Sequence, residues 1–266
     1  MSASPVLLSI DERGVATVTL NRPEVNNAYN GALVQGLLDT FGQLVRDPAV
    51  RVIVIRGNGR HFQAGADLKW LQEIGGMNAQ ANHEASLATA SAMRGLNAID
   101  KPTIALVHGA CVGGGTGVVA SCDIAIAERE ATFAISEARW GVAATIIFPQ
   151  LNAAIGVRNV RRYALSCERF DAQRALAMGL IHEVCEPGGL DAAAAPVIDG
   201  LLKAAPGAIA LSKRSAMTCA NLLFDDDTFA RLVNEHADKR RSAEATEGLR
   251  SFVEKREANW YPAKPA

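Results

Sequence analysis

The sequence predicts a layered α/β body with an α-helical C-terminal extension. Up to Gly141, β-rich runs alternate with segments whose apolar residues recur at helical spacing. Beyond that residue, nearly every segment shows helical spacing alone. Strand pairs and helices that alternate along a chain form layers around one core, so the sheet is expected in the first half of the chain.

The N-terminal elements are predicted from turn residues and periodicity. Residues 6–10 and 15–20 are β-rich and flank a polar turn that ends in Gly14, which predicts a hairpin. Residues 31–46 carry apolar side chains at helical spacing and are stopped by Asp47-Pro48. A helix should therefore follow the hairpin.

The next strand should be covered on both faces, because residues 50–56 form a nearly continuous β-branched run. A polar connector at 75–82 is predicted to be a mobile loop. The remaining first-half elements are strands at 103–107, 123–127 and 132–135 and helices at 67–74, 83–99 and 114–121. The extension should hold a strand at 181–184 and helices at 157–166, 172–178, 193–204, 206–220, 228–241 and 244–257.

Composition excludes several classes of protein. Hydrophobic residues make up 49% and charged residues 21% of the 266 residues, which is typical of a soluble globular protein. Lysine plus arginine number 27 against 28 aspartate plus glutamate, which argues against a nucleic-acid partner. The five cysteines lack metal or redox spacing and the start lacks a signal peptide, so a cytoplasmic protein with free thiols is expected.

One uncharged stretch, residues 103–122, reaches the length of a membrane span. Its five glycines and His108 argue against that alternative. Glycine should break the stretch into a strand, a turn and a short helix, so no membrane partner is expected.

Two glycine-rich turns are candidates for chemistry. Residues 112–117 place Gly113, Gly114, Gly115 and Gly117 between a strand and a helix, where free N–H groups and the helix dipole gather at one point. A dinucleotide site is the alternative, but the helix that follows is too short for a nucleotide-binding crossover. Residues 62–67 form a similar turn, and two such turns facing each other would make an oxyanion hole.

Several segments together resemble one enzyme family. The chain is similar to the crotonase (enoyl-CoA hydratase/isomerase) superfamily in the order of its motifs, and it most resembles bacterial hydratases of methylglutaconyl-CoA and isohexenylglutaconyl-CoA. These motifs are Asn21-Arg22-Pro23 with Asn27-Ala28, residues 59–68, residues 101–105, Gly113-Gly114-Gly115, Cys122-Asp123-Ile124, Ser136-Glu137-Ala138-Arg139 and residues 252–256. The resemblance implies a crotonase-like spiral of repeated strand-strand-helix units at 1–200 with the coenzyme A site. It also implies a helical oligomerisation region at 201–266 and a homotrimer or a dimer of trimers.

The resemblance also implies the catalytic residues. The N–H groups of Ala66 and Gly114 would hold the thioester oxygen, where water addition develops enolate charge. Hydratases of the family carry two glutamates; here the first position is Gly117 and the second is Glu137. Glu137 is therefore expected to act as the acid and base, and Gly117 would leave room for a branched substrate. A solvated glutamate or a partner for Arg139 is the alternative for Glu137.

The remaining implied contacts concern the substrate. Arg139 is a candidate partner for the distal carboxylate of a glutaconyl group, with a surface or intersubunit salt bridge as the alternative. The resemblance places Ala28, Ala64, Asp67, Lys69, Gly113, Gly117, Phe252 and Lys255 along the coenzyme A and acyl site. No metal and no cofactor is expected, since coenzyme A is part of the substrate.

The resulting hypothesis is a hydratase, a lyase that converts a branched glutaconyl-CoA to a 3-hydroxyacyl-CoA in acyclic terpene or leucine catabolism. A thioester hydrolase or an enoyl-CoA isomerase on the same scaffold is the first alternative. A non-catalytic acyl-CoA-binding or RNA-binding assembly protein is the second, and the near-neutral charge argues against RNA.

Overall fold

A computed structural model of the chain describes residues 4–220, 225–256 and 258–259. Its main sheet has six strands in the order β1-β2-β3-β4-β6-β9, and all neighbours after the β1–β2 hairpin are parallel. These strands are β1 Val6–Ile10, β2 Val15–Leu20, β3 Val52–Gly57, β4 Thr103–Val107, β6 Ile124–Glu128 and β9 Glu183–Cys185. A smaller sheet contains β5 Ala110–Val112, β7 Thr132–Ala134 and β8 Phe170–Asp171.

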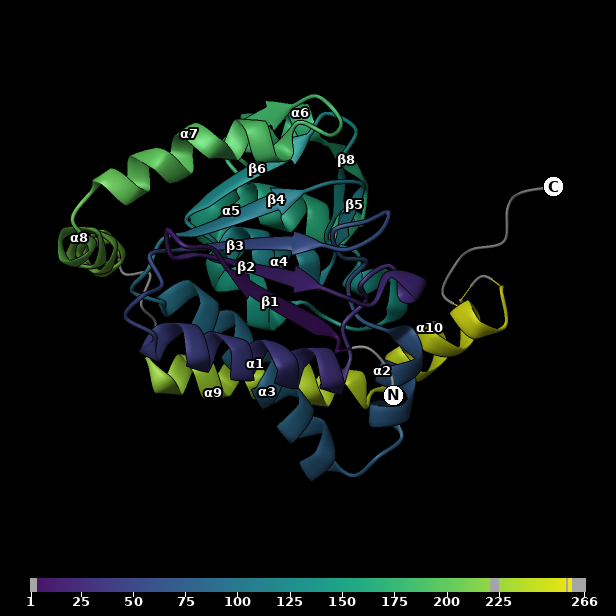
Figure 1. The fold of residues 1–266 in the computed structure, drawn as a ribbon. Coiled ribbons are helices and arrows are strands. Elements are labelled where there is room, and N and C mark those ends of the chain that lie inside the picture. The colour runs from purple at the N-terminus through teal and green to yellow at the C-terminus, as the bar shows by residue number, and fades with distance from the viewer. Residues whose placement is uncertain (1–3, 221–224, 257, 260–266) are drawn as a thin grey trace.

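Helices cover both faces of the main sheet, as Figure 1 shows for α7 on one side and for α1, α3 and α9 on the other. The helices are α1 Gly31–Arg46, α2 Leu68–Gly75, α3 Ala79–Ala98, α4 Gly114–Ser121, α5 Phe148–Ser166, α6 Ala172–Met178, α7 Leu190–Lys203, α8 Pro206–Cys219, α9 Asp226–Arg240 and α10 Ala243–Val253. Three short 3-10 helices span Pro23–Val25, Glu137–Trp140 and Thr145–Ile147. The structure confirms the predicted mixed α/β class.

Strand β3 shows why its sequence is almost continuously apolar. Ile53 and Ile55 join the main core beneath the sheet, whereas Val52 and Val54 join a second cluster that packs on α7. Because successive strand residues point to opposite faces, a strand between two helical layers buries every side chain. Each such burial contributes roughly 1.5–3 kcal/mol, so the double covering fixes the strands that lead to the site.

The structure corrects the prediction of a mobile loop at 75–82, because helix occupies part of that range. Helix α3 begins at Ala79, because the Asn78 side chain accepts a hydrogen bond from the Ala81 N–H at 2.9 Å and caps the first turn. The Asn82 side chain is buried and donates to the Ile74 carbonyl at 2.6 Å. Only three residues, 76–78, separate helices α2 and α3.

Two further boundaries differ from the prediction. Helix α5 starts at Phe148, nine residues before position 157, and contains a break at Gly156, whose φ is 73°. The expected strand at 132–135 ends at Ala134, and Glu137 lies in a 3-10 helix. The end of the helix expected at 244–257 lies partly outside the described residues, and α10 ends at Val253.

The C-terminal segment does not stand apart from the core. Helix α9 packs against α3 and contributes Leu232 and Val233 to the main core. Helix α8 buries no residue within this chain. An oligomerisation role for residues 201–266 stays a prediction.

The uncharged stretch at 103–122 forms β4, β5 and α4, so its predicted division by glycine is confirmed. No single helix within the described ranges has both the length and the apolar character to cross a membrane. Helices α7 and α8 meet the length and composition criteria only as a pair, and that pair is bent by 105°.

A buried asparagine ties together the loops that precede the site. Asn27 is fully buried, and its amide donates to the carbonyls of Asn58 and His61 at 2.8 Å. Its side-chain oxygen accepts from the Arg22 N–H at 2.8 Å. Buried polar groups of this kind are costly to leave unpaired.

We expect Asn27→Ala to lower the free energy of unfolding by about 3 kcal/mol, because the substitution strips partners from several buried backbone groups. Denaturant unfolding at one fixed protein concentration measures the change. Asn58→Ala is the matched control, since that side chain is exposed and should cost less than about 0.5 kcal/mol. Equal losses in the two variants would contradict this account.

Candidate active site

The first candidate turn follows β3 and leads into α2. Gly65 has a φ of 85°, a conformation that glycine adopts readily. The Tyr29 N–H donates to the Gly65 carbonyl at 2.8 Å, and the Asp67 N–H donates to the Tyr29 carbonyl at 2.9 Å. In this parallel bridge the two bonds flank Ala66, so the Ala66 N–H points away from the Tyr29 backbone.

The second turn joins β5 to α4. Gly113 has a φ of 56°, and its N–H donates to the Ala134 carbonyl at 2.8 Å. Gly114 is the first residue of α4, where a backbone N–H has no partner within the helix. The helix dipole adds partial positive charge at the same end. The Gly114 N–H is therefore placed to bind a developing negative charge.

The two turns are in direct contact. A Cβ built on Gly65 would lie 3.0 Å from the Val112 carbonyl oxygen, and one built on Gly113 would lie 3.5 Å from the Gly65 Cα. Neither position has space for a side chain. The turns that carry Ala66 and Gly114 therefore lie against each other, as an oxyanion hole formed by their N–H groups would require.

Glu137 faces the second turn. A Cβ added to Gly113 would lie 2.9 Å from Glu137 Oε1, so the carboxyl group contacts this glycine. Its Oε2 is buried and has no hydrogen-bond partner within the described chain. Burial raises the pKa of Glu137 to about 7, against the opposing effect of the Glu137 and Ser136 backbone N–H groups. Near neutral pH the group can both accept and donate a proton.

The position of the missing second glutamate is filled by an apolar side chain. A Cβ on Gly117 would lie 2.4 Å from Ile147 Cγ2. Ile147 lines the cavity beside Glu137, whereas Gly117 is not among the described residues that line it. Gly117 therefore acts on the site by admitting Ile147, and the open space expected at this position is occupied.

A small apolar cavity lies beside Glu137 and Gly114. Its apolar wall includes Val34, Leu37, Met93, Ile146 and Ile147. Glu137 is the only carboxylate among the described residues that line it. The cavity has a volume of about 20 Å³, which is room for about one water molecule beside the Glu137 carboxyl group.

Sequence reasoning missed two polar residues of this cavity, Tyr29 and His236. The Tyr29 ring packs on the second turn, since a Cβ on Gly114 would lie 2.7 Å from Tyr29 Cε1, and burial raises the pKa of its hydroxyl. Burial lowers the pKa of His236 to about 3. Tyr29 had one weak signal, its position two residues after Asn27. His236 had none, because its neighbours come from distant helices.

A wide groove runs from the cavity to the surface and gathers most of the predicted coenzyme A contacts. Its described lining includes Ala28, Ala64, Asp67, Lys69, Arg139 and Phe252. Lys255 lies in an adjoining depression that Arg139 and Phe252 also line. Lys69 and Arg139 are exposed, as phosphate contacts would require. Their roles stay predictions.

The Asp67 carboxylate has a structural task. It caps helix α2 through the Lys69 N–H, and it pairs with Arg22 at 3.2 Å. Both side chains are less than a fifth exposed, at 19% for Asp67 and 16% for Arg22. Asp67 thus holds the first turn in place from behind.

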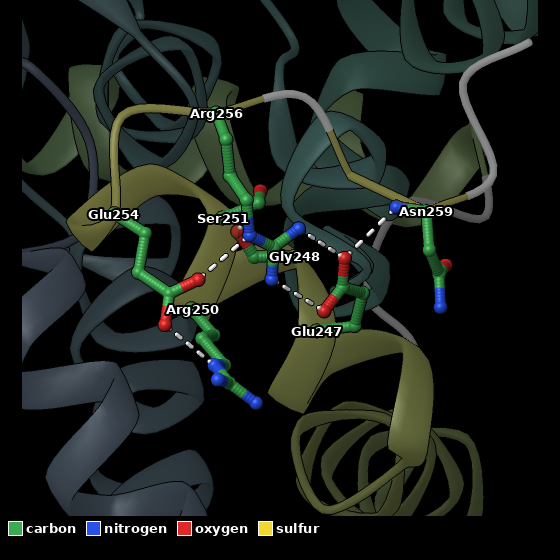
Figure 2. A network of polar contacts seen from close by, with 7 residues as sticks. All are labelled: Glu247, Gly248, Arg250, Ser251, Glu254, Arg256 and Asn259. Carbon is green, nitrogen blue, oxygen red and sulfur yellow. Dashed lines mark hydrogen bonds and ion pairs between the residues drawn. The ribbon is translucent and has the colours of Figure 1, made fainter. Parts of the chain in front are cut away.

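The end of α10 is fixed by the charge network drawn in Figure 2. Arg256 contacts Glu247 and Glu254 at 2.6 Å, and Arg250 contacts Glu254 at 2.7 Å. Phe252, which lies on the same helix, packs edge-on against Trp140 with ring centroids 5.1 Å apart. The contacts place Phe252 at the rim of the groove.

Candidate metal and thiol ligands are dispersed. Within the described ranges, no group of three histidine, cysteine, aspartate or glutamate side chains could hold a metal ion. The five cysteines are free thiols. Burial raises the pKa of Cys111 well above its usual value, which disfavours the nucleophilic thiolate.

Comparisons with known proteins show which family the chain belongs to. Residues 11–262 match the enoyl-CoA hydratase/isomerase family. The mevalonyl-coenzyme A hydratase of Aspergillus fumigatus is 32% identical over 97% of this chain and 95% of its own length. The short-chain-enoyl-CoA hydratase of Clostridium acetobutylicum is 29% identical over 92% of this chain and 93% of its own length. The crystal structure of an enoyl-CoA hydratase from Mycobacterium avium superposes with a TM-score of 0.84 at 36% identity, covering 98% of this chain and 100% of that one. The protein is therefore a member of the enoyl-CoA hydratase/isomerase family.

Proposed function

We propose that the protein hydrates the double bond of a branched glutaconyl-CoA, such as isohexenylglutaconyl-CoA or 3-methylglutaconyl-CoA, to give a 3-hydroxyacyl-CoA. The observation that carries this proposal is the single buried carboxyl group of Glu137 beside two facing N–H turns. The similarity to a mevalonyl-coenzyme A hydratase adds support for a hydration reaction. Such a step belongs to the breakdown of acyclic terpenes or leucine.

The reaction needs a base, an oxyanion site and an acid. The ionised Glu137 carboxylate takes a proton from water, and the oxygen of that water bonds to the β-carbon of the enoyl thioester. The alkene electrons move toward the carbonyl, and the Ala66 and Gly114 N–H groups stabilise the resulting enolate oxygen. The enolate then collapses as Glu137, now protonated, gives a proton to the α-carbon.

The apolar wall at Ile147 explains how one carboxyl group can serve the whole reaction. A second ionised carboxylate beside Glu137 would raise the cost of charging either group. With Ile147 in that position, no second carboxyl group among the described residues lines the cavity, and Glu137 cycles between its two protonation states. An isomerase could use the same single carboxyl group to move a proton between the α- and γ-carbons, so the two activities must be separated by their products.

The first experiment follows 3-methylglutaconyl-CoA by absorbance, thiol release and product mass. We expect the conjugated absorbance to fall, the thioester to persist and the mass to rise by that of one water. Free thiol would indicate hydrolysis, and loss of conjugation at constant mass would indicate isomerisation. Glu137→Gln should lower kcat/KM by at least about 100-fold, whereas the exposed Glu84→Gln should not. Turnover within a few-fold of wild type in Glu137→Gln would contradict the mechanism.

The second prediction concerns pH. The folded protein holds the pKa of Glu137 at about 7, above its usual value of 4.5, because burial disfavours the charged form. Since only the ionised carboxylate can accept the water proton, kcat/KM should rise with pH through about 7 and level off above it. His236 should not cause this rise of kcat/KM with pH, because its pKa is about 3. A midpoint of this rise near pH 4.5 would contradict the assignment to Glu137. A midpoint that shifts in His236→Asn would contradict it as well.

The third prediction tests the apolar wall. Gly117→Ala should lower the free energy of unfolding by about 1–3 kcal/mol, because the new methyl group overlaps Ile147. Gly95→Ala is the matched control: Gly95 lies inside helix α3 with nothing within 4 Å of its added Cβ. That change should stabilise the protein by about 0.5–1 kcal/mol. Chemical denaturation distinguishes the two, and a neutral Gly117→Ala would argue against close packing here.

A further inference from the structure

A buried arginine forms part of the same groove. Arg240 is the last residue of α9, and its side chain is 1% exposed. It lines the groove together with Glu137, Tyr29 and the turn at Gly65 and Ala66. Arginine stays protonated at all ordinary pH values, so this position carries a permanent positive charge.

The contacts of Arg240 use only part of its guanidinium group. Nη2 donates to the Asn82 carbonyl at 2.8 Å and to Ser86 Oγ at 2.6 Å. The guanidinium carbon lies 5.9 Å from the centre of the Trp70 ring. Nε and Nη1 are buried without any hydrogen-bond partner in the described part of the chain. Two nitrogens of the charged group therefore remain unpaired.

Nothing nearby supplies the missing negative charge. No carboxylate of the described residues forms an ion pair with Arg240. Tyr29 interacts with it but has a pKa raised by burial, so its hydroxyl is neutral. His236, one turn earlier on α9, is also neutral, and its Nδ1 lies 3.0 Å from Ser86 Oγ. A buried cation without a counter-ion is costly to the fold.

We propose that Arg240 binds a carboxylate at the distal end of the acyl chain and thereby selects acyl-CoA substrates that carry a terminal acid. This inference rests on the proposed function, because it identifies the substrate class of the same site. A carboxylate bound at this part of the groove would pair with the unused Nε and Nη1 donors in a place sheltered from water, where a charge-assisted hydrogen bond is strong. A neutral acyl chain would leave both donors unpaired.

This proposal assigns the distal carboxylate to Arg240, whereas the sequence suggested Arg139. Arg139 is exposed at the groove and lies within the 3-10 helix Glu137–Trp140, so strand alternation does not direct its side chain. Water screens an exposed charge and weakens its discrimination between acidic and neutral chains. Arg240 is buried in the wall of the groove, where the same charge discriminates far more strongly.

The test compares two substrates that differ only in the distal carboxylate, 3-methylglutaconyl-CoA and 3-methylcrotonyl-CoA. The acidic-to-neutral ratio of kcat/KM should exceed one in wild type. It should fall on the order of 100-fold in Arg240→Met, chiefly through a higher KM for the acidic thioester. Arg240→Lys should recover part of the ratio, since it keeps the charge but not the planar group. Arg231→Met, an exposed arginine on the same helix, is the matched control and should keep the wild-type ratio.

An equal loss with both thioesters in Arg240→Met would overturn the proposal, because it would mean that Arg240 serves the coenzyme A phosphates or the fold alone. The proposal would also be overturned if Arg139→Met lowered the acidic-to-neutral ratio of kcat/KM and Arg240→Met left it unchanged.

A binding measurement on wild-type protein covers the case in which Arg240→Met does not fold. Calorimetry should show glutaryl-CoA binding at least about ten-fold more tightly than pentanoyl-CoA. Equal affinities would overturn the role of Arg240. A preference for glutaryl-CoA without any hydration would instead refute the proposed hydratase function and leave the carboxylate site standing, so the two failures are distinguishable.

Discussion

The site depends on one steric constraint, the contact between the turns at Gly65 and Gly113. Both glycines have positive φ, and the space that a side chain would need is occupied by backbone of the other turn or by the Glu137 carboxyl group. Because no side chain intervenes, the turns that carry the Ala66 and Gly114 N–H groups lie against each other. Hydrogen bonds donated by the Tyr29 and Asp67 N–H groups hold the first turn, and the Ala134 carbonyl, which accepts from the Gly113 N–H, holds the second. Such preorganisation is what allows backbone dipoles to stabilise an enolate without rearranging.

Burial then determines what Glu137 can do. A glutamate in water would be fully ionised at neutral pH, whereas the enclosed carboxyl group of Glu137 has a pKa of about 7. The same apolar surroundings exclude a second acid, because Ile147 occupies the space beside Gly117. The cavity thus combines one acid of balanced protonation with an apolar wall, which suits a reaction in which a proton is first removed and later returned.

Arg240 and Glu137 give the groove two buried ionisable groups with opposite properties. Glu137 changes its protonation state easily, whereas the Arg240 charge is permanent and two of its three guanidinium nitrogens have no hydrogen-bond partner in the described part of the chain. A substrate with a thioester at one end and a carboxylate at the other would satisfy both groups. The proposed preference for an acidic acyl chain thus rests on Arg240, which lies on a helix that the sequence assigned to the C-terminal extension.

The sequence by itself determined the elements whose signals are local: the hairpin at Gly14, the doubly buried strand β3, the glycine turns and the position of Glu137 after a short strand. It did not determine the start of α3, because the Asn78 cap gave a weaker signal than the polar composition of the connector. Only the tertiary structure decided that Ile147 fills the space at Gly117, that Tyr29 packs on Gly114, and that Arg240 is buried beside Glu137. The reason is physical: burial, pKa and unpaired charge depend on neighbours that are distant in sequence, and these three pairs are separated by 30, 85 and 103 residues.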